Sequence, residues 1–253
     1  MKNILYEDND ILVAYKPAGI ATQTSRIGQQ DMVSELKNYL VKVQKEEMSG
    51  KNGKDAVKKQ TFQEPYLGLV HRLDQPVSGV LVFAKNKKAA ADLSNQISNG
   101  TMKKFYYALI YGTPIRERDT LEDYLYKDGR ENLSIIVNAT FPDAKKAILN
   151  YRHCSTLMVL EEGEEVSLME IELLTGRHHQ IRAQMSNAGM PLLGDSKYGS
   201  ERSKELSRDI GCKNVALCAY KLSFKHPTTH KEMVFEREPD EELFDPFLNE
   251  GIL

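Results

Sequence analysis

Runs of apolar residues bounded by turn-forming residues predict the main strands of this chain. Residues 4–6 and 11–15 form two short apolar runs separated by an acidic turn, which indicates a pair of strands. Every residue from 80 to 84 is apolar, so both faces of a strand there would be covered, as in the centre of a packed sheet. Just before this run, Gln75-Pro76 and Ser78-Gly79 supply turn-forming residues. A tight loop at 71–79 is therefore expected to lead into a buried strand.

Apolar residues recur every three or four positions in three other stretches, which predicts three amphipathic helices. The first begins after Asp31, the second ends at 99–100, and the third ends at Gly189, just before Pro191. The positions that carry these periods are Val33, Leu36, Leu40, Val43, Ala89, Ala90, Leu93, Ile97, Ile181, Met185 and Ala188.

Residues 103–111 alternate in the manner of a strand with two different faces. Positions 105, 107, 109 and 111 are large and apolar or aromatic, and we expect them to pack in the core. The opposite face carries Lys104, Tyr106 and Ala108, a combination that suits a cleft wall where a base could stack. An isolated tyrosine is more often a core residue with its hydroxyl bonded.

The remaining segments complete an α+β fold, in which a mixed, mainly antiparallel sheet is flanked by helices. Alternating runs between 120 and 174 predict an antiparallel meander, and runs at 215–224 and 233–235 predict a hairpin around 226–229. Residues 45–63 hold five lysines and few large apolar residues, which indicates a mobile insertion that could touch phosphates or simply be solvated. We expect one domain over residues 1–253, with an acidic tail at 236–253.

Composition narrows the class of protein. With 253 residues and 41% apolar content, the chain can bury a sizeable core. Neither a signal peptide nor a membrane-spanning run is evident, which predicts a cytoplasmic protein with no membrane partner. Cys154, Cys212 and Cys218 are odd in number and widely spaced, so neither a disulfide framework nor a zinc site is expected.

The distribution of charge favours a polyanionic partner more than the net charge does. The net charge is −2, but residues 236–253 hold seven acidic residues and one arginine, a contribution of −6. Residues 1–235 therefore carry −2 + 6 = +4. A mildly basic body suits a protein that contacts phosphates on one face, although a chance acidic tail would give the same numbers.

The loop at 71–79 is the best candidate for chemistry. A rigid strand holds such a loop in place, and His71, Arg72 and Asp74 are its polar residues. A lone aspartate in a turn ordinarily bonds its own backbone. Arg72 changes that interpretation, because a nearby permanent cation favours the charged carboxylate, which can act as a nucleophile. Lys16, at the end of the 11–15 strand and followed by Pro17, is expected to be displayed, as a solvated lysine or as part of a cleft.

Two other kinds of chemistry would use some of the same residues. The adjacent His178 and His179 invite a metal site, but neighbouring side chains on a helix diverge, so no metal is expected. A metal hydrolase using these two residues and His71 would show metal on elemental analysis. Residues 71–74 faintly resemble a kinase catalytic loop, but the chain has neither a Gly-x-Gly-x-x-Gly nor an Asp-Phe-Gly motif.

Several ordered motifs resemble those of the RluA-type RNA pseudouridine synthases, and together they span residues 4–235 apart from the 45–63 insertion. Such a set is far more specific than any single motif. Two positions depart from the common form, because Val77 stands where relatives usually have Thr and Cys218 where they often have His. The motifs are Lys16-Pro17-x-Gly19, His71-Arg72-Leu73-Asp74 with Ser78-Gly79, Lys104-x-Tyr106-x-Ala108, Thr175-Gly176-Arg177-x-His179-Gln180-Ile181-Arg182 with Gly194-Asp195 and Tyr198-Gly199, and Phe224-x-His226-Pro227-x-Thr229.

The resemblance implies the pseudouridine synthase catalytic fold and a set of roles. Asp74 would be the nucleophile, Arg182 would pair with it, and Tyr106 would lie against the target uracil. The residues expected to contact substrate are Lys16, His71, Arg72, Lys104, Arg177 and His179. The reaction would convert uridine to pseudouridine in tRNA or ribosomal RNA, by attack of Asp74 at C1′ or at C6. No cofactor or metal would be needed, and a monomer is expected. A non-catalytic RNA-binding protein of the same fold is the alternative, although it would have no use for the set of Asp74, Tyr106 and Arg182.

Overall fold

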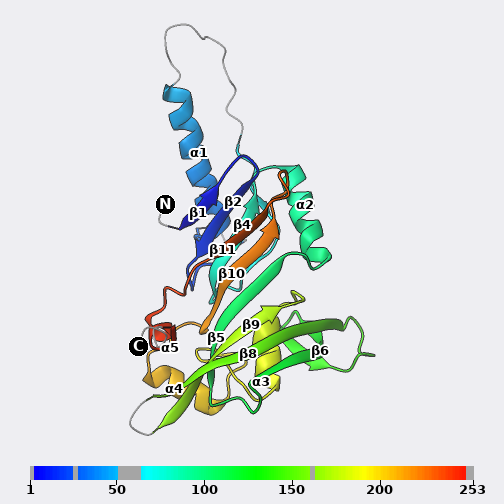
Figure 1. Cartoon of the computed structure of the whole chain (residues 1–253), viewed down its shortest axis with the longest axis vertical. Coiled ribbons are helices and arrows are strands. Elements are labelled where there is room, and N and C mark those ends of the chain that lie inside the picture. Colours follow the sequence, from blue (N-terminus) through cyan, green and yellow to red (C-terminus); the bar gives the residue numbers. More distant parts are fainter. Residues whose placement is uncertain (1–2, 25–27, 51–63, 160–162, 249–253) are drawn as a thin grey trace.

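A single mixed sheet of eleven strands runs through the part of the chain that the structure describes (Figure 1). The structure is a computed structural model and describes residues 3–24, 28–50, 64–159 and 163–248. The main strand order is β1-β2-β4-β10-β5-β9-β8-β6-β7, with β3 paired to β4 and β11 paired to β10. The strands are β1 (Ile4–Glu7), β2 (Ile11–Lys16), β3 (Gly68–Leu69), β4 (Ser78–Ala84), β5 (Lys103–Tyr111), β6 (Arg118–Asp128), β7 (Leu133–Val137), β8 (Lys145–Val159), β9 (Glu164–Leu173), β10 (Leu217–Lys225) and β11 (Glu232–Glu236). The helices are α1 (Met32–Gly50), α2 (Lys87–Ser98), α3 (Gln180–Asn187), α4 (Glu201–Asp209), the 3-10 helix η1 (Glu242–Phe244) and α5 (Asp245–Leu248).

Strand β4 is buried along its whole length, as its unbroken apolar run predicts. All seven of its residues are buried. It pairs antiparallel with β2 and, over a short stretch, parallel with β10. This is the one parallel pair among the named strands of the described chain, so the expectation of a mixed, mainly antiparallel sheet with flanking helices is confirmed.

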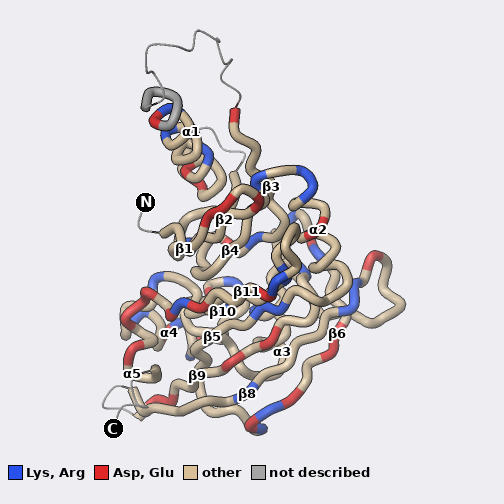
Figure 2. Tube along the Cα trace, turned by 45° about the horizontal axis from the view of Figure 1, so that its top comes forward, with Lys and Arg blue, Asp and Glu red and all other residues tan. Residues whose placement is uncertain are grey.

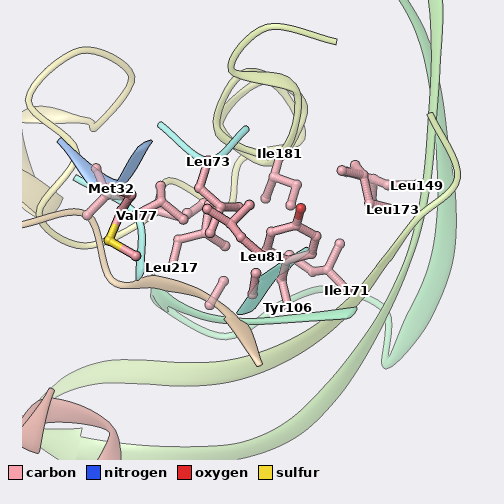
Figure 3. Close-up of a cluster of buried hydrophobic side chains, with 14 of the residues drawn as sticks. Met32, Leu73, Val77, Leu81, Tyr106, Leu149, Ile171, Leu173, Ile181 and Leu217 are labelled. Carbon is pink, nitrogen blue, oxygen red and sulfur yellow. The ribbon is translucent and has the colours of Figure 1, made fainter. Parts of the chain in front are cut away.

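The two faces of β4 serve two separate cores. Leu81 and Phe83 face a cluster that includes Leu36 and Leu40 of α1, whereas Val82 faces a cluster that includes α2 residues. Successive side chains of a strand point to opposite faces, so a continuous apolar run can cover both. The cluster on the α1 face continues across the sheet to Tyr106, Ile171 and Ile181 (Figure 3).

Strand β5 only partly follows the expected division into a core face and a cleft face. Phe105 and Tyr107 were expected in the core but are half-buried, and the Tyr107 ring stacks on Tyr220 at 3.9 Å between centroids. Tyr106 and Ala108, on the opposite face, are the buried pair. The reason is tertiary, because that face packs against the α1-side cluster.

Strands β6 to β9 are antiparallel as predicted but are not in simple sequential order. Strand β8 pairs with both β9 and β6, and β7 folds back along the other edge of β6. The β6–β7 hairpin therefore lies at the edge of the sheet, beside α3. This position brings β7 close to the candidate site.

Two expectations about irregular segments need correction. Helix α1 continues through residue 50, so residues 45–50 are helical instead of part of a loop, and residues 51–63 lie outside the described chain. Lys, Glu, Gln and Met favour a helix without needing a packed partner, and Lys42 and Glu46 form an ion pair one turn apart.

The acidic C-terminal segment is also not a free tail over its described length. Phe244 and Phe247 are buried in a cluster with Leu109 and Leu206, and η1 and α5 form around them. The backbone N–H of Asp240 donates to the Tyr15 hydroxyl at 3.1 Å. The acidic residues thus lie on a packed strap, and residues 249–253 lie outside the described chain.

A close backbone approach between β4 and β10 provides a test of the fold. Gly79 has a φ of +130°, and a Cβ there would stand 2.5 Å from both the backbone nitrogen and oxygen of Ala219 on β10. We expect Gly79→Ala to lower the free energy of unfolding by about 3 kcal/mol, because strain and overpacking both act at this position. Equilibrium urea denaturation measures this loss. Gly129→Ala, whose Cβ would meet open space, should leave the midpoint unchanged. Equal stability of the Gly79 variant and the wild type would contradict the close β4–β10 contact.

Candidate active site

The loop that carries Asp74 is fixed to the segment after β2 by hydrogen bonds. The backbone N–H of Leu73 donates to the Thr22 hydroxyl at 3.2 Å, and that hydroxyl donates to the Leu73 carbonyl at 2.8 Å. The backbone N–H of Gly19 donates to the Gln75 carbonyl at 2.9 Å. These bonds bracket Asp74 on both sides, so its backbone has little freedom.

Lys16 belongs to this scaffold and not to the surface of the cleft. Its side chain is fully buried, and its Nζ donates to the carbonyls of Pro17 (3.0 Å), Ile20 (2.6 Å) and Gln75 (3.0 Å). Burial lowers the pKa of Lys16 to about 8, against the opposing attraction of Asp74. The expectation of a displayed lysine is therefore wrong, because the strand end turns inward and the ammonium donates to three backbone carbonyls of the turn and of the Asp74 loop.

Arg182 joins Asp74 to a second, fully buried carboxylate. Its Nη1 donates to Asp74 Oδ2 at 3.2 Å, as the sequence motifs imply. Its Nε and Nη2 donate to Asp195 Oδ2 and Oδ1 at 2.7 and 2.8 Å. The Asp195 side chain is 0% exposed, whereas the Asp74 side chain is 28% exposed. Burial alone would raise the pKa of Asp195, but the hydrogen bonds and charge of Arg182 outweigh that effect and lower it.

His179 faces the same carboxylate from the start of α3. Its Nε2 lies 3.7 Å from Asp74 Oδ2, and its Nδ1 lies 2.9 Å from the Tyr198 hydroxyl. That hydroxyl already accepts the backbone N–H of Ser134 at 2.6 Å, so its own hydrogen is free to donate to Nδ1. We assign the ring hydrogen of His179 to Nε2, facing Asp74. Burial lowers the pKa of His179 to about 4, against the opposing effect of Asp74, so the ring is neutral at pH 7.

The two adjacent histidines do not diverge as expected. Their rings stack with centroids 3.7 Å apart, because α3 begins at Gln180 and both residues precede it. His179 has a left-handed backbone, with φ of 49°, and His178 Nδ1 lies 3.0 Å from the Ser134 hydroxyl. Within the described residues, no group of three potential metal ligands occurs.

Asp74 lines a cavity of about 660 Å³, a volume typical of sites that bind small molecules. The lining contains five Lys or Arg residues and a single acidic residue, Asp74. Elsewhere along the chain, basic and acidic residues are interspersed (Figure 2). The cavity is therefore a local concentration of positive charge around one carboxylate. The lining cations are Arg72, Lys104, Lys127, Arg177 and Arg182.

Tyr106 lies in the wall of this cavity, and its hydroxyl points toward Ile181 (Figure 3). Burial, and then the charge of Asp74, raise the pKa of the Tyr106 phenol above its usual value, so the phenol keeps its proton. Among the described residues, the hydroxyl makes no hydrogen bond. A buried phenol without a protein partner is available to a ligand.

The other predicted contact residues line the cavity in different ways. His71 is half-buried and accepts the backbone N–H of Val82 at Nε2, at 3.2 Å. Burial, and then the charge of Lys104, lower the pKa of His71 to about 3, so the ring is neutral. Lys104 itself forms no hydrogen bond or ion pair within the described chain. Arg72 and Arg177 are exposed at the rim, and Arg177 Nε donates to the Lys146 carbonyl at 2.8 Å.

The structure adds three residues whose roles the sequence motifs did not indicate. Asp195 and Tyr198 belong to a motif shared with the family, but the resemblance assigned them no role. Ser134 lies on β7 and belongs to none of the motifs. Tyr198 stacks beside Arg182, with the guanidinium carbon 5.1 Å from the ring centroid. The position of Asp195 in the Gly194-Asp195 pair of the motif is the sequence feature that marks this residue. Its partner Arg182 lies thirteen residues upstream on α3, so the sequence alone did not reveal the pair.

Comparison with known proteins identifies the family. The sequence profile described as RNA pseudouridylate synthase matches residues 10–187. The chain is 34% identical over 234 residues to the uncharacterized RNA pseudouridine synthase YhcT of Bacillus subtilis, covering 92% of this chain and 67% of that protein. It is 29% identical over 230 residues to ribosomal large subunit pseudouridine synthase C of Vibrio parahaemolyticus, covering 91% and 63%.

Solved structures agree on the fold. Human RNA pseudouridylate synthase domain containing 4 superposes with a TM-score of 0.70 at 19% identity, covering 98% of this chain and 92% of that chain. No helix within the described residues is long and apolar enough to cross a membrane. The profile match extends over most of the chain and includes Asp74, Tyr106 and Arg182, and on that ground this protein belongs to the RNA pseudouridine synthase family.

Proposed function

We propose that Asp74 is the nucleophile with which this RNA pseudouridine synthase isomerises a uridine, and that the cavity around it holds the flipped-out nucleotide. The observation that carries the proposal is the contact of Asp74 with Arg182 in the lining of a cavity that contains four further cations. A carboxylate held in one orientation and partly exposed can attack carbon, and the surrounding cations suit RNA phosphates. A flipped nucleotide gives the enzyme access to atoms that are hidden in a base stack.

The reaction exchanges one bond to the ribose for another within a single nucleotide. The glycosidic C1′–N1 bond breaks, uracil turns within the cavity, and a C1′–C5 bond forms. N1 gains a proton and C5 loses one, so the atoms balance without an external reactant. The Asp74 carboxylate either attacks C1′ and is displaced by C5, or adds to C6 and leaves in the last step. The position of Asp74 in the cavity is compatible with both routes.

The surrounding residues have distinct proposed roles. Arg182 orients Asp74, and Tyr106 lies where a uracil ring would stack, with its unpaired hydroxyl available for proton transfer. Lys104 is an unpaired ammonium inside the cavity, suited to a phosphate or a uracil carbonyl. Arg72 and Arg177 at the rim suit the RNA backbone.

The class of RNA is a proposal drawn from relatives. Several relatives carry the name ribosomal large subunit pseudouridine synthase C, which favours ribosomal RNA over tRNA for this chain. The cytoplasmic location, the monomeric state and the single domain stay predictions. Mapping pseudouridines in total RNA from cells with and without the gene identifies the target.

Replacement of the proposed nucleophile is the first test. We expect Asp74→Asn to abolish pseudouridine formation, measured as tritium released from total RNA that was labelled at uracil C5 in cells lacking the gene. RNA affinity should stay within about tenfold, because phosphate contacts dominate binding. The exposed Asp209→Asn variant serves as the control and should retain full activity. Full activity of the Asp74 variant would exclude Asp74 as the nucleophile.

Tyr106 allows a test of proton transfer separately from stacking. We expect Tyr106→Phe to reduce the rate at least about 100-fold, the usual contribution of a positioned proton-transfer group. Thermal stability should be unchanged, because the hydroxyl makes no hydrogen bond to the described protein. Tyr107→Phe, on the opposite face of β5, is the matched control and should retain activity. Retained activity of the Tyr106 variant would leave stacking as its only role.

The neutral His71 predicts how stability depends on pH. Its pKa is about 3 in the folded protein and 6.5 ordinarily, so between these values the unfolded chain binds a proton that the folded chain does not. Stability is therefore lost as pH falls below 6.5, by up to about 1.4 kcal/mol per pH unit. His71→Asn keeps an acceptor for Val82 and should flatten this slope in urea denaturation between pH 7 and pH 5. The exposed His230→Asn variant should keep the wild-type slope, and parallel curves for all three proteins would contradict a neutral His71.

A further inference from the structure

Asp195 is a fully buried charged partner of Arg182, and it cannot touch RNA. Its side chain is 0% exposed, and its two oxygens accept Arg182 Nε and Nη2 at 2.7 and 2.8 Å. Only Nη1 of the guanidinium is directed at Asp74, at the longer distance of 3.2 Å. The stronger pair of Arg182 is therefore with Asp195 and not with the proposed nucleophile.

Because of the shape of the guanidinium, its pair with Asp195 fixes the orientation of Arg182. The group is planar and rigid, so two parallel bonds along its Nε–Nη2 edge fix the position of Nη1. The ring of Tyr198 lies against Arg182, at 5.1 Å from its central carbon, and limits movement out of the plane. Without Asp195, the arginine would keep one hydrogen bond to a partly exposed carboxylate, and several side-chain orientations could satisfy that bond.

Asp195 is itself held from two directions. Its Oδ1 also accepts the backbone N–H groups of Lys197 and Tyr198 at 3.0 and 3.1 Å. Two residues earlier, Leu193 donates its N–H to the Leu109 carbonyl of β5 at 2.9 Å. Because β5 also carries Tyr106, one strand sets the positions of both the phenol and the carboxylate that orients Arg182.

The charges of the three groups add a second consequence. One guanidinium is shared between two carboxylates, so the network carries a net charge of −1 and the cation is largely balanced by Asp195. The neighbouring histidine does not add a positive charge, because burial lowers the pKa of His179 to about 4. Asp74 is therefore oriented by a cation that another anion already neutralises, which leaves its own negative charge available for attack on carbon.

We propose that Asp195 is a positioning residue of this enzyme, which acts on the nucleophile Asp74 solely by orienting and neutralising Arg182. The inference rests on the proposed role of Asp74. It assigns a function to a residue that touches neither the substrate nor the nucleophile.

The experiment is a double-mutant cycle on the C5 tritium-release assay. We expect Asp195→Asn to lower kcat about 100-fold, because misplacement of a catalytic group by about 1 Å has that effect. KM for the labelled total RNA should change less than about threefold, because the buried side chain makes no contact with RNA and phosphate contacts dominate binding. In an Arg182→Gln background, Asp195→Asn should change kcat by less than about threefold, because the group through which it acts is gone.

The double variant is expected to fold even if Asp195→Asn alone does not. It removes the buried charges of Arg182 and Asp195 together, so neither charge is left without a partner. If the Asp195→Asn single variant does not fold, the test compares kcat of Arg182→Gln with kcat of the double variant. Equal kcat for those two proteins supports the proposal, and a further loss of tenfold or more overturns it. Wild-type kcat in a folded Asp195→Asn protein also overturns it.

Two controls separate this inference from the proposed function. Asp8→Asn removes a carboxylate that accepts the Asp10 and Ile11 N–H groups, outside the cavity lining. It should lower stability and leave kcat and KM unchanged. Asp74→Asn must be inactive for the cycle to be interpreted through Asp74. An active Asp74→Asn protein refutes the proposed function, whereas an inactive one beside a fully active Asp195→Asn protein refutes only the positioning role.

Discussion

The site depends on one cation that joins three segments far apart in the chain. Arg182, on α3, holds Asp74 from the loop before β4 and Asp195 from the loop after Met190. A buried guanidinium loses the solvation of water, and only partners with matching geometry compensate for that loss. The position of α3 against the sheet is thus coupled to the carboxylate at the base of the cavity.

The Asp74 loop illustrates how a buried charge can serve structure alone. Lys16 is a lysine at the end of a strand near the site, where a phosphate-binding residue could be expected. Its ammonium instead donates hydrogen bonds to three backbone carbonyls next to the Asp74 loop. Backbone carbonyls buried without partners are costly, so a lysine directed inward stabilises the turn through the carbonyls to which it donates. The rigid loop and the exposed cations at the rim are therefore separate parts of the site.

Burial also determines the protonation states of the histidines and the tyrosine in the cavity. His71 and His179 are neutral at pH 7 because their surroundings disfavour the charged rings, and the Tyr106 phenol keeps its proton for the same reason. The remaining cations of the cavity are arginines and lysines. The arginines keep their charge throughout the neutral range, whereas burial lowers the pKa of Lys104. The cavity therefore places the Asp74 carboxylate among arginine cations and neutral histidines.

The sequence alone determined the features that follow from local pattern: the central strand at 80–84, the start of α1, the ends of α2 and α3, and the mainly antiparallel sheet. Family resemblance indicated the set of Asp74, Tyr106 and Arg182, which the structure brings together. The sequence did not determine whether a charged residue points outward or inward. Lys16 is buried, Asp195 is the main partner of Arg182, and the acidic segment near Phe244 is packed, and each of these facts depends on contacts between residues far apart in the chain. Local periodicity reports which residues share a face of a strand or helix, but the partner that covers the face is chosen only when distant segments pack together.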